Sequence, residues 1–108
     1  MEYSKTEKRA LRLLLAEAHR RELTRALKRL HQEFRHWESG DIDSFELNER
    51  IHHYHQNEAR AIWSRYNVAQ PSLMIVADLV QSGLMTLEEV PDVLREQVAK
   101  ALQALSET

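Results

Sequence analysis

The sequence predicts an all-α protein, a bundle of about four helices, and three observations support this prediction. Helix breakers are rare, since the 108 residues include two glycines and two prolines. Each of these falls where a helix boundary is signalled in other ways. No stretch alternates apolar and polar residues with period two, and no hairpin turn lies between β-branched runs. The chain therefore has no candidate strands.

The first predicted helix runs from about Ser4 to Glu38, with capping-box spacing between Ser4 and Glu7 and with Gly40 after its end. Its apolar face changes side near residues 19–22. The earlier group comprises Leu11, Leu14, Leu15 and Ala18, and the later group comprises Leu23, Leu27, Leu30, Phe34 and Trp37. At about 100° per residue the two groups lie more than about 90° apart. Either the helix breaks near residues 19–22, or it is continuous and its two faces serve two partners.

The second predicted helix, residues 43–66, has the best-marked start in the chain. Asp43 suits the N-cap and Glu46 the third helical position, where its carboxylate can reach back to the cap. Ile42 and Leu47 occupy the positions of a hydrophobic staple. These signals favour a helix that begins directly after Asp43.

The last two predicted helices follow from the remaining breakers. Pro71 suits the first turn of a third helix and Gly83 its end. Residues 73–80 between them are apolar nearly all round, so we expect this helix to be the central, buried element. A fourth helix opens with a turn at 86–89 and continues after Pro91 with helical apolar spacing.

Size and composition narrow the class of protein. A chain of 108 residues has a common size for one domain, and we expect a single domain over residues 1–108. Cysteine is absent, which excludes a thiol nucleophile and a cysteine-based zinc site. The longest apolar runs, 13–16 and 73–77, are too short for a membrane span or a signal sequence. We therefore expect a cytoplasmic, bacterial protein without membrane contact.

Histidines next to glutamates raise the possibility of a metal centre. Glu33 with His36 and Glu49 with His52 reproduce the Glu-x-x-His pairs of di-metal helical bundles. Such ligands must point into the bundle, whereas Glu49 and His52 project about 100° or more from the apolar stripe of their helix. We therefore favour histidines that face solvent, and keep a metal-dependent enzyme as the second alternative.

No motif commits the chain to a reaction. The sequence contains no glycine-rich phosphate loop, no nucleophile elbow and no Ser, His and Asp constellation of recognisable spacing. We therefore expect a protein that is not an enzyme, with no catalytic residues and no cofactor.

A basic stripe follows the first helix on the side opposite the later apolar group. Its members are Arg21, Arg25, Lys28, Arg29 and Arg35. A stripe of this kind can follow a phosphate backbone, so nucleic-acid binding is the first alternative function. An acidic protein partner fits equally well, and an ordinary solvated face is the simplest interpretation.

Among the features of the sequence, the earlier leucine group gives the strongest indication of function. If the first helix is continuous, this group faces away from the core that the later group defines, and exposed leucines mark an interface. If the helix breaks, the group folds back onto the bundle. We expect a non-enzymatic protein-interaction or regulatory module acting through this helix, most simply a two-fold homodimer. Phe45 and Trp63 lie off the stripe of the second helix and either extend the interface or pack against helix ends.

The segments 37–47, 51–55 and 63–66 carry a resemblance. They read Trp-Glu-Ser-Gly-Asp-Ile-Asp-Ser-Phe-Glu-Leu, Ile-His-His-Tyr-His and Trp-Ser-Arg-Tyr. In this pattern the chain resembles short uncharacterised bacterial helical proteins that share a G-D/E-I…E-L…I-H-x-Y/F-H core. The resemblance covers a minority of the chain and implies no activity. Any role of the histidines would lie at residues 52–55.

Overall fold

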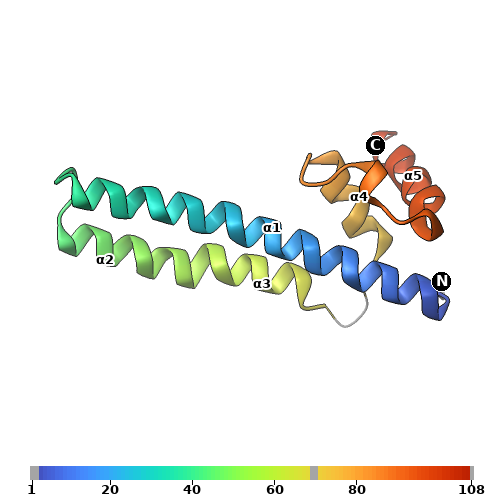
Figure 1. Ribbon diagram of the computed structural model, residues 1–108, viewed down its shortest axis with the longest axis horizontal. Coiled ribbons are helices and arrows are strands. Elements are labelled where there is room, and N and C mark those ends of the chain that lie inside the picture. Colours follow the sequence, from blue (N-terminus) through green and yellow to red (C-terminus); the bar gives the residue numbers. More distant parts are fainter. Residues whose placement is uncertain (1–2, 69–70, 108) are drawn as a thin grey trace. The chain divides into compact units, whose positions relative to one another are not determined.

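The computed structural model describes residues 3–68 and 71–107, and within these ranges it contains helices and no strand. The elements are α1 (Lys5–Glu38), α2 (Ser44–His53), the π-helix η1 (Tyr54–Ala59), α3 (Arg60–Tyr66), α4 (Leu73–Gln81), the 3₁₀ turn η2 (Leu87–Glu89) and α5 (Asp92–Ser106). Because α2, η1 and α3 follow one another without a gap, they form one rod (Figure 1). The predicted all-α fold of about four helices is confirmed.

The ends of α1 and the start of α2 lie where the local signals predict them, whereas α4 begins at Leu73 with Ser72 as its N-cap, so Pro71 precedes the first turn instead of lying in it. The amide of Ser4 donates to the Glu7 carboxylate at 2.9 Å, and the amide of Glu7 donates to the Ser4 hydroxyl at 3.1 Å. Asp43 caps α2 by accepting from the amide of Glu46 at 2.8 Å. Gly40 has φ +85°, a left-handed conformation that glycine adopts without the steric cost that a Cβ imposes. Capping therefore sets both ends of the turn between α1 and α2.

α1 is continuous from Lys5 to Glu38, so it does not break at residues 19–22. Contacts nevertheless group the chain into two compact units. The core unit joins the residues up to Ala18 with those from Val68 onward, and the hairpin comprises His19–Asn67. The sequence predicts one domain over residues 1–108; the structure distinguishes two units within it, and α1 supplies residues to both. The division coincides with the change of apolar face in α1.

The core unit contains the earlier leucine group, and this corrects the interface prediction. Leu11, Leu14, Leu15 and Ala18 are all buried, with Leu11 only 2% exposed. They are covered because the residues from Val68 onward pack with the first part of α1, and Gln97 of α5 donates a hydrogen bond to Glu7. α4, predicted as the most buried helix, contributes Leu73, Val76, Ala77 and Leu79 to the same core. The leucine group is therefore part of a core and offers no surface to a partner.

The hairpin consists of the second part of α1 and the antiparallel rod of α2, η1 and α3 (Figure 1). Its buried apolar residues are Ala26, Leu47 and Ile62. The later apolar group of α1, expected to define the core, is only partly covered, since Leu27 is 50% exposed and Trp37 is also exposed. The earlier group of α1 is therefore the more deeply buried one, and the later group is only partly covered within one chain. Among the described residues, no helix combines the length and the hydropathy of a membrane span.

Candidate functional site

Ion pairs cross one face of the hairpin from α1 to the returning rod. We call this set the ion-pair ladder; its pairs are Glu22 with Arg65, Arg29 with Glu58, and Glu33 with Arg50. As the α1 residue moves toward the turn, its partner lies 43, 29 and then 17 residues away in sequence. This order is that of two antiparallel helices in register. The ladder therefore sets the alignment of the hairpin.

At the open end of the hairpin, the ladder becomes a small network around Glu22. One oxygen of this carboxylate accepts hydrogen bonds from Arg65 and from the Tyr66 hydroxyl, both at 2.6 Å. The Tyr66 ring stacks on His19 with the ring centroids 4.9 Å apart. Burial, and then the bond to Glu22, raise the pKa of Tyr66 above its usual value. The network holds the end of α3 against α1 where the apolar face of α1 changes side.

The raised pKa of Tyr66 predicts that the hairpin weakens in alkali. Because the folded state favours the neutral phenol, this contribution is complete below about pH 10, the usual tyrosine pKa, and is lost as the pH rises above it. Urea unfolding, followed by fluorescence of Trp37 and Trp63, should give a free energy of unfolding that is constant below about pH 10 and falls as the pH rises above it. The Tyr66→Phe variant should lose less stability over this range, and an equal loss would contradict the prediction.

A shallow groove of about 420 Å³ lies along the ladder. Leu30 and Tyr54 line it, together with the side chains of two ladder pairs. These pairs are Arg29 with Glu58 and Glu33 with Arg50. Each of the four side chains forms an ion pair with its partner across the groove. These four charged groups are therefore neutralised in pairs, whereas Glu49, which also lines the groove, is exposed.

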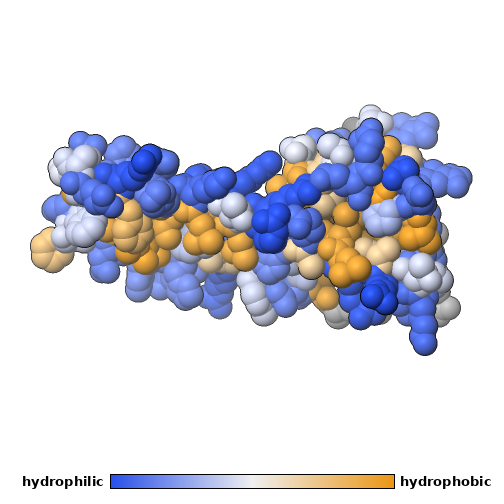
Figure 2. Space-filling model, in the orientation of Figure 1, coloured by the Kyte–Doolittle hydropathy of each residue, from blue (hydrophilic) through white to orange (hydrophobic). Residues whose placement is uncertain are grey.

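The opposite side of the hairpin carries what we call the apolar face. Its members are Leu23, Leu27, Phe34, Ile51 and Trp63. Leu27 lies about 120° or more around α1 from each ladder residue of that helix, by the helical spacing of about 100° per residue. Leu27, Ile51 and Trp63 are exposed, while Leu23 and Phe34 are half-buried. Figure 2 shows hydrophobic side chains gathered in a band along the hairpin, between hydrophilic edges.

The returning rod contains the π-helix η1 between α2 and α3. A π-helix has more residues per turn than an α-helix, so it shifts the direction of every side chain after it. After the π-helix, Ile62 is buried and Ala61 is exposed, and Trp63, which the sequence already places off the stripe of this helix, is 60% exposed. Phe45 is also exposed, so neither aromatic packs against a helix end.

Only part of the predicted basic stripe is both exposed and outside an ion pair. Arg25, Lys28 and Arg35 are exposed on the outer side of α1. Arg29 is bound to Glu58 in the ladder, and Arg21 is half-buried and engaged with other groups. Within the described residues, the stripe therefore reduces to three exposed cations that form no ion pair.

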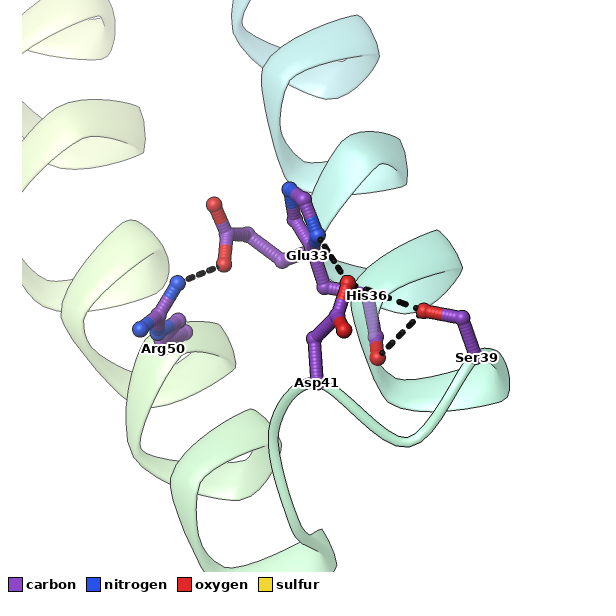
Figure 3. Close-up of polar contacts among 5 residues, drawn as sticks. All are labelled: Glu33, His36, Ser39, Asp41 and Arg50. Carbon is purple, nitrogen blue, oxygen red and sulfur yellow. Dashed lines mark hydrogen bonds and ion pairs between the residues drawn. The ribbon is translucent and has the colours of Figure 1, made fainter.

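The structure does not bring the candidate metal ligands together. Glu33 reaches across to Arg50 and His36 turns away to Asp41, as Figure 3 shows. Hydrogen bonds from His36 and Ser39 lower the pKa of Asp41. The other two candidates, Glu49 and His52, are exposed, and His52 contacts Gln56 at 3.2 Å. Over residues 3–68 and 71–107, no three His, Asp or Glu side chains are grouped as a metal site would require.

No family model matches the chain, and neither a curated protein nor a solved structure matches it. The resemblance in residues 37–66 therefore stays a prediction, and the surfaces of the molecule itself must support any function.

Proposed function

We propose that the chain is a non-enzymatic protein-interaction module whose docking surface is the apolar face of the hairpin. The observation that carries this proposal is the exposure of Leu27, Ile51 and Trp63 on one side of a hairpin whose other side bears the ion-pair ladder. A contiguous exposed apolar patch flanked by polar residues is typical of an interface. The proposal keeps the predicted class of function and moves its surface from residues 11–18 to the hairpin.

The spacing of the later apolar group indicates what kind of partner fits. From Leu23 to Trp37 its members recur at alternating intervals of four and three residues, and Leu23, Leu27 and Phe34 of this group belong to the apolar face. This is the spacing by which a helix packs against other helices. Burying one exposed leucine side chain contributes about 1.5–3 kcal/mol, so a few such residues support a stable complex. The partner should therefore present apolar helical ridges of its own.

The groove along the ladder supports a non-enzymatic role. General acid–base chemistry needs a titratable group directed at a substrate and held at a suitable pKa. Two of the three acids at this groove, Glu33 and Glu58, are bonded to arginines of the same hairpin, and the third, Glu49, is exposed to solvent. Their interactions serve the alignment of the two helices.

A photo-crosslinker placed on the apolar face tests this proposal in the cells that make the protein. With p-benzoylphenylalanine in place of Leu27, irradiation should yield a discrete covalent adduct. The same group in place of Lys28, the next residue and one that faces outward, is the matched control and should yield none. Adducts that are absent at both positions, or equal at both, would contradict the proposal.

Nucleic-acid binding is a second candidate, favoured by one observation. Within the described residues, Arg25, Lys28 and Arg35 are exposed and form no ion pair with a carboxylate. Three phosphate contacts would give a logarithmic salt dependence of about −2 to −3. A mobility shift with DNA or RNA should then weaken with salt and vanish in the triple glutamate variant, whereas Lys100→Glu should leave it intact. The absence of a shift at low salt would end this candidate.

A further inference from the structure

We infer that the partner of the apolar face is a second copy of this chain, so that two hairpins pack face to face into a four-helix bundle. This inference rests on the proposed function, because it names the occupant of the same surface. This dimer differs from the one that the sequence suggests. That dimer would be formed by the earlier leucine group, which is buried inside one chain.

The hairpin has too small a core of its own. Among the described residues, it buries Ala26, Leu47 and Ile62, whereas the other thirteen of the sixteen buried apolar residues lie in the core unit. A pair of helices can bury only the line along which they touch, and helical bundles complete a core by adding further helices on the apolar side. A second hairpin supplies two helices of matching length, spacing and face.

The area of the face is sufficient for a stable dimer. Residues 19–38 span about 30 Å as a helix, and two packed helices about 8–10 Å apart present a face about 20 Å wide. Two such faces in contact bury about 1,200 Å² in total, which lies at the lower end of the range for specific interfaces. The dimer should therefore be specific and of moderate affinity.

The charges around the face also suit a second copy. The neighbours of Leu27 one helical turn away are Thr24 and His31, and those of Ile51 are Asn48 and His55. None of these four is a carboxylate, lysine or arginine. The charged residues one turn from the other members of the face lie toward its two ends and differ in sign, with Arg20 and Arg60 at the open end and Glu38 near the turn. The middles of two identical faces can therefore meet without the like-charge repulsion that disfavours self-association. The charged ladder remains on the outer side of each hairpin. A strongly basic or acidic partner would find no opposite charge at the middle of this face.

The oligomeric state of the purified chain tests the inference. We expect sedimentation or light scattering to give twice the chain mass of 12.7 kDa. Leu27→Glu should weaken the dimer at least about 100-fold, because two carboxylates would have to be buried at one interface. Lys28→Glu, the matched control, should remain dimeric. Far-UV circular dichroism of Leu27→Glu should be unchanged, since Leu27 is 50% exposed within one chain.

Ile51→Glu provides an independent variant on the other helix, should Leu27→Glu fail to fold. A wild-type chain that is monomeric at every concentration overturns the inference, as does a dimer that both variants leave intact. The crosslinker at Leu27 distinguishes failure of the dimer inference from failure of the proposed function. An adduct of twice the chain mass supports the inference. A discrete adduct with a different protein overturns the inference and leaves the proposed function standing, while a monomer without any adduct contradicts both.

Discussion

Leu11→Ala should lower the free energy of unfolding by about 2–5 kcal/mol, as expected when a buried leucine is truncated and its site cannot fully collapse. Leu11 is 2% exposed and lies in the core unit with Val76, Leu94 and Val98. Urea unfolding followed by far-UV circular dichroism would measure the loss. Circular dichroism is the suitable signal because both tryptophans lie in the hairpin and do not report on this core.

Leu13→Ala is the matched control, since Leu13 is the same residue type on the same helix but is 63% exposed. Its stability should change by less than about 0.5 kcal/mol. Equal losses for Leu11→Ala and Leu13→Ala would contradict the burial of the earlier leucine group. A Leu11→Ala variant that kept its stability but changed its oligomeric state would instead favour the interface that the sequence suggests.

Glu22→Ala should destabilise the hairpin by about 1–3 kcal/mol, the usual cost of leaving partly buried polar groups without a partner. The Glu22 side chain is 16% exposed and serves both Arg65 and Tyr66. Its removal also separates the end of α3 from α1. Fluorescence-monitored unfolding should detect this, because Trp63 lies one turn before Tyr66.

Glu49→Ala is the control for Glu22→Ala, because Glu49 is an exposed glutamate of the same hairpin. It should change stability by less than about 0.5 kcal/mol. A double-mutant cycle of Glu22→Ala with Tyr66→Phe should give a coupling energy of about 0.5–3 kcal/mol, as for residues that share a hydrogen bond. Additive effects would show that the hydroxyl of Tyr66 does not stabilise the hairpin through Glu22.

The side-chain contacts of the candidate site could not be predicted from the sequence. The Glu-x-x-His pairs are visible in the sequence, yet Glu33 is committed to Arg50, a residue 17 positions away. The network of Glu22 with Tyr66 joins residues 44 positions apart and has no linear signal at all. Contacts of this kind are formed only when the chain closes on itself.

The sequence by itself determined the helices, their ends and the existence of two apolar faces on α1. These features depend on residues three or four positions apart, as in the bonds between Ser4 and Glu7 and between Asp43 and Glu46. Only the tertiary structure decided which face is the core. Residues from Val68 onward cover Leu11 and its neighbours, while a hairpin of two helices leaves Leu27 half exposed. The burial of a helix face depends on what packs against it, and helical periodicity does not contain that information.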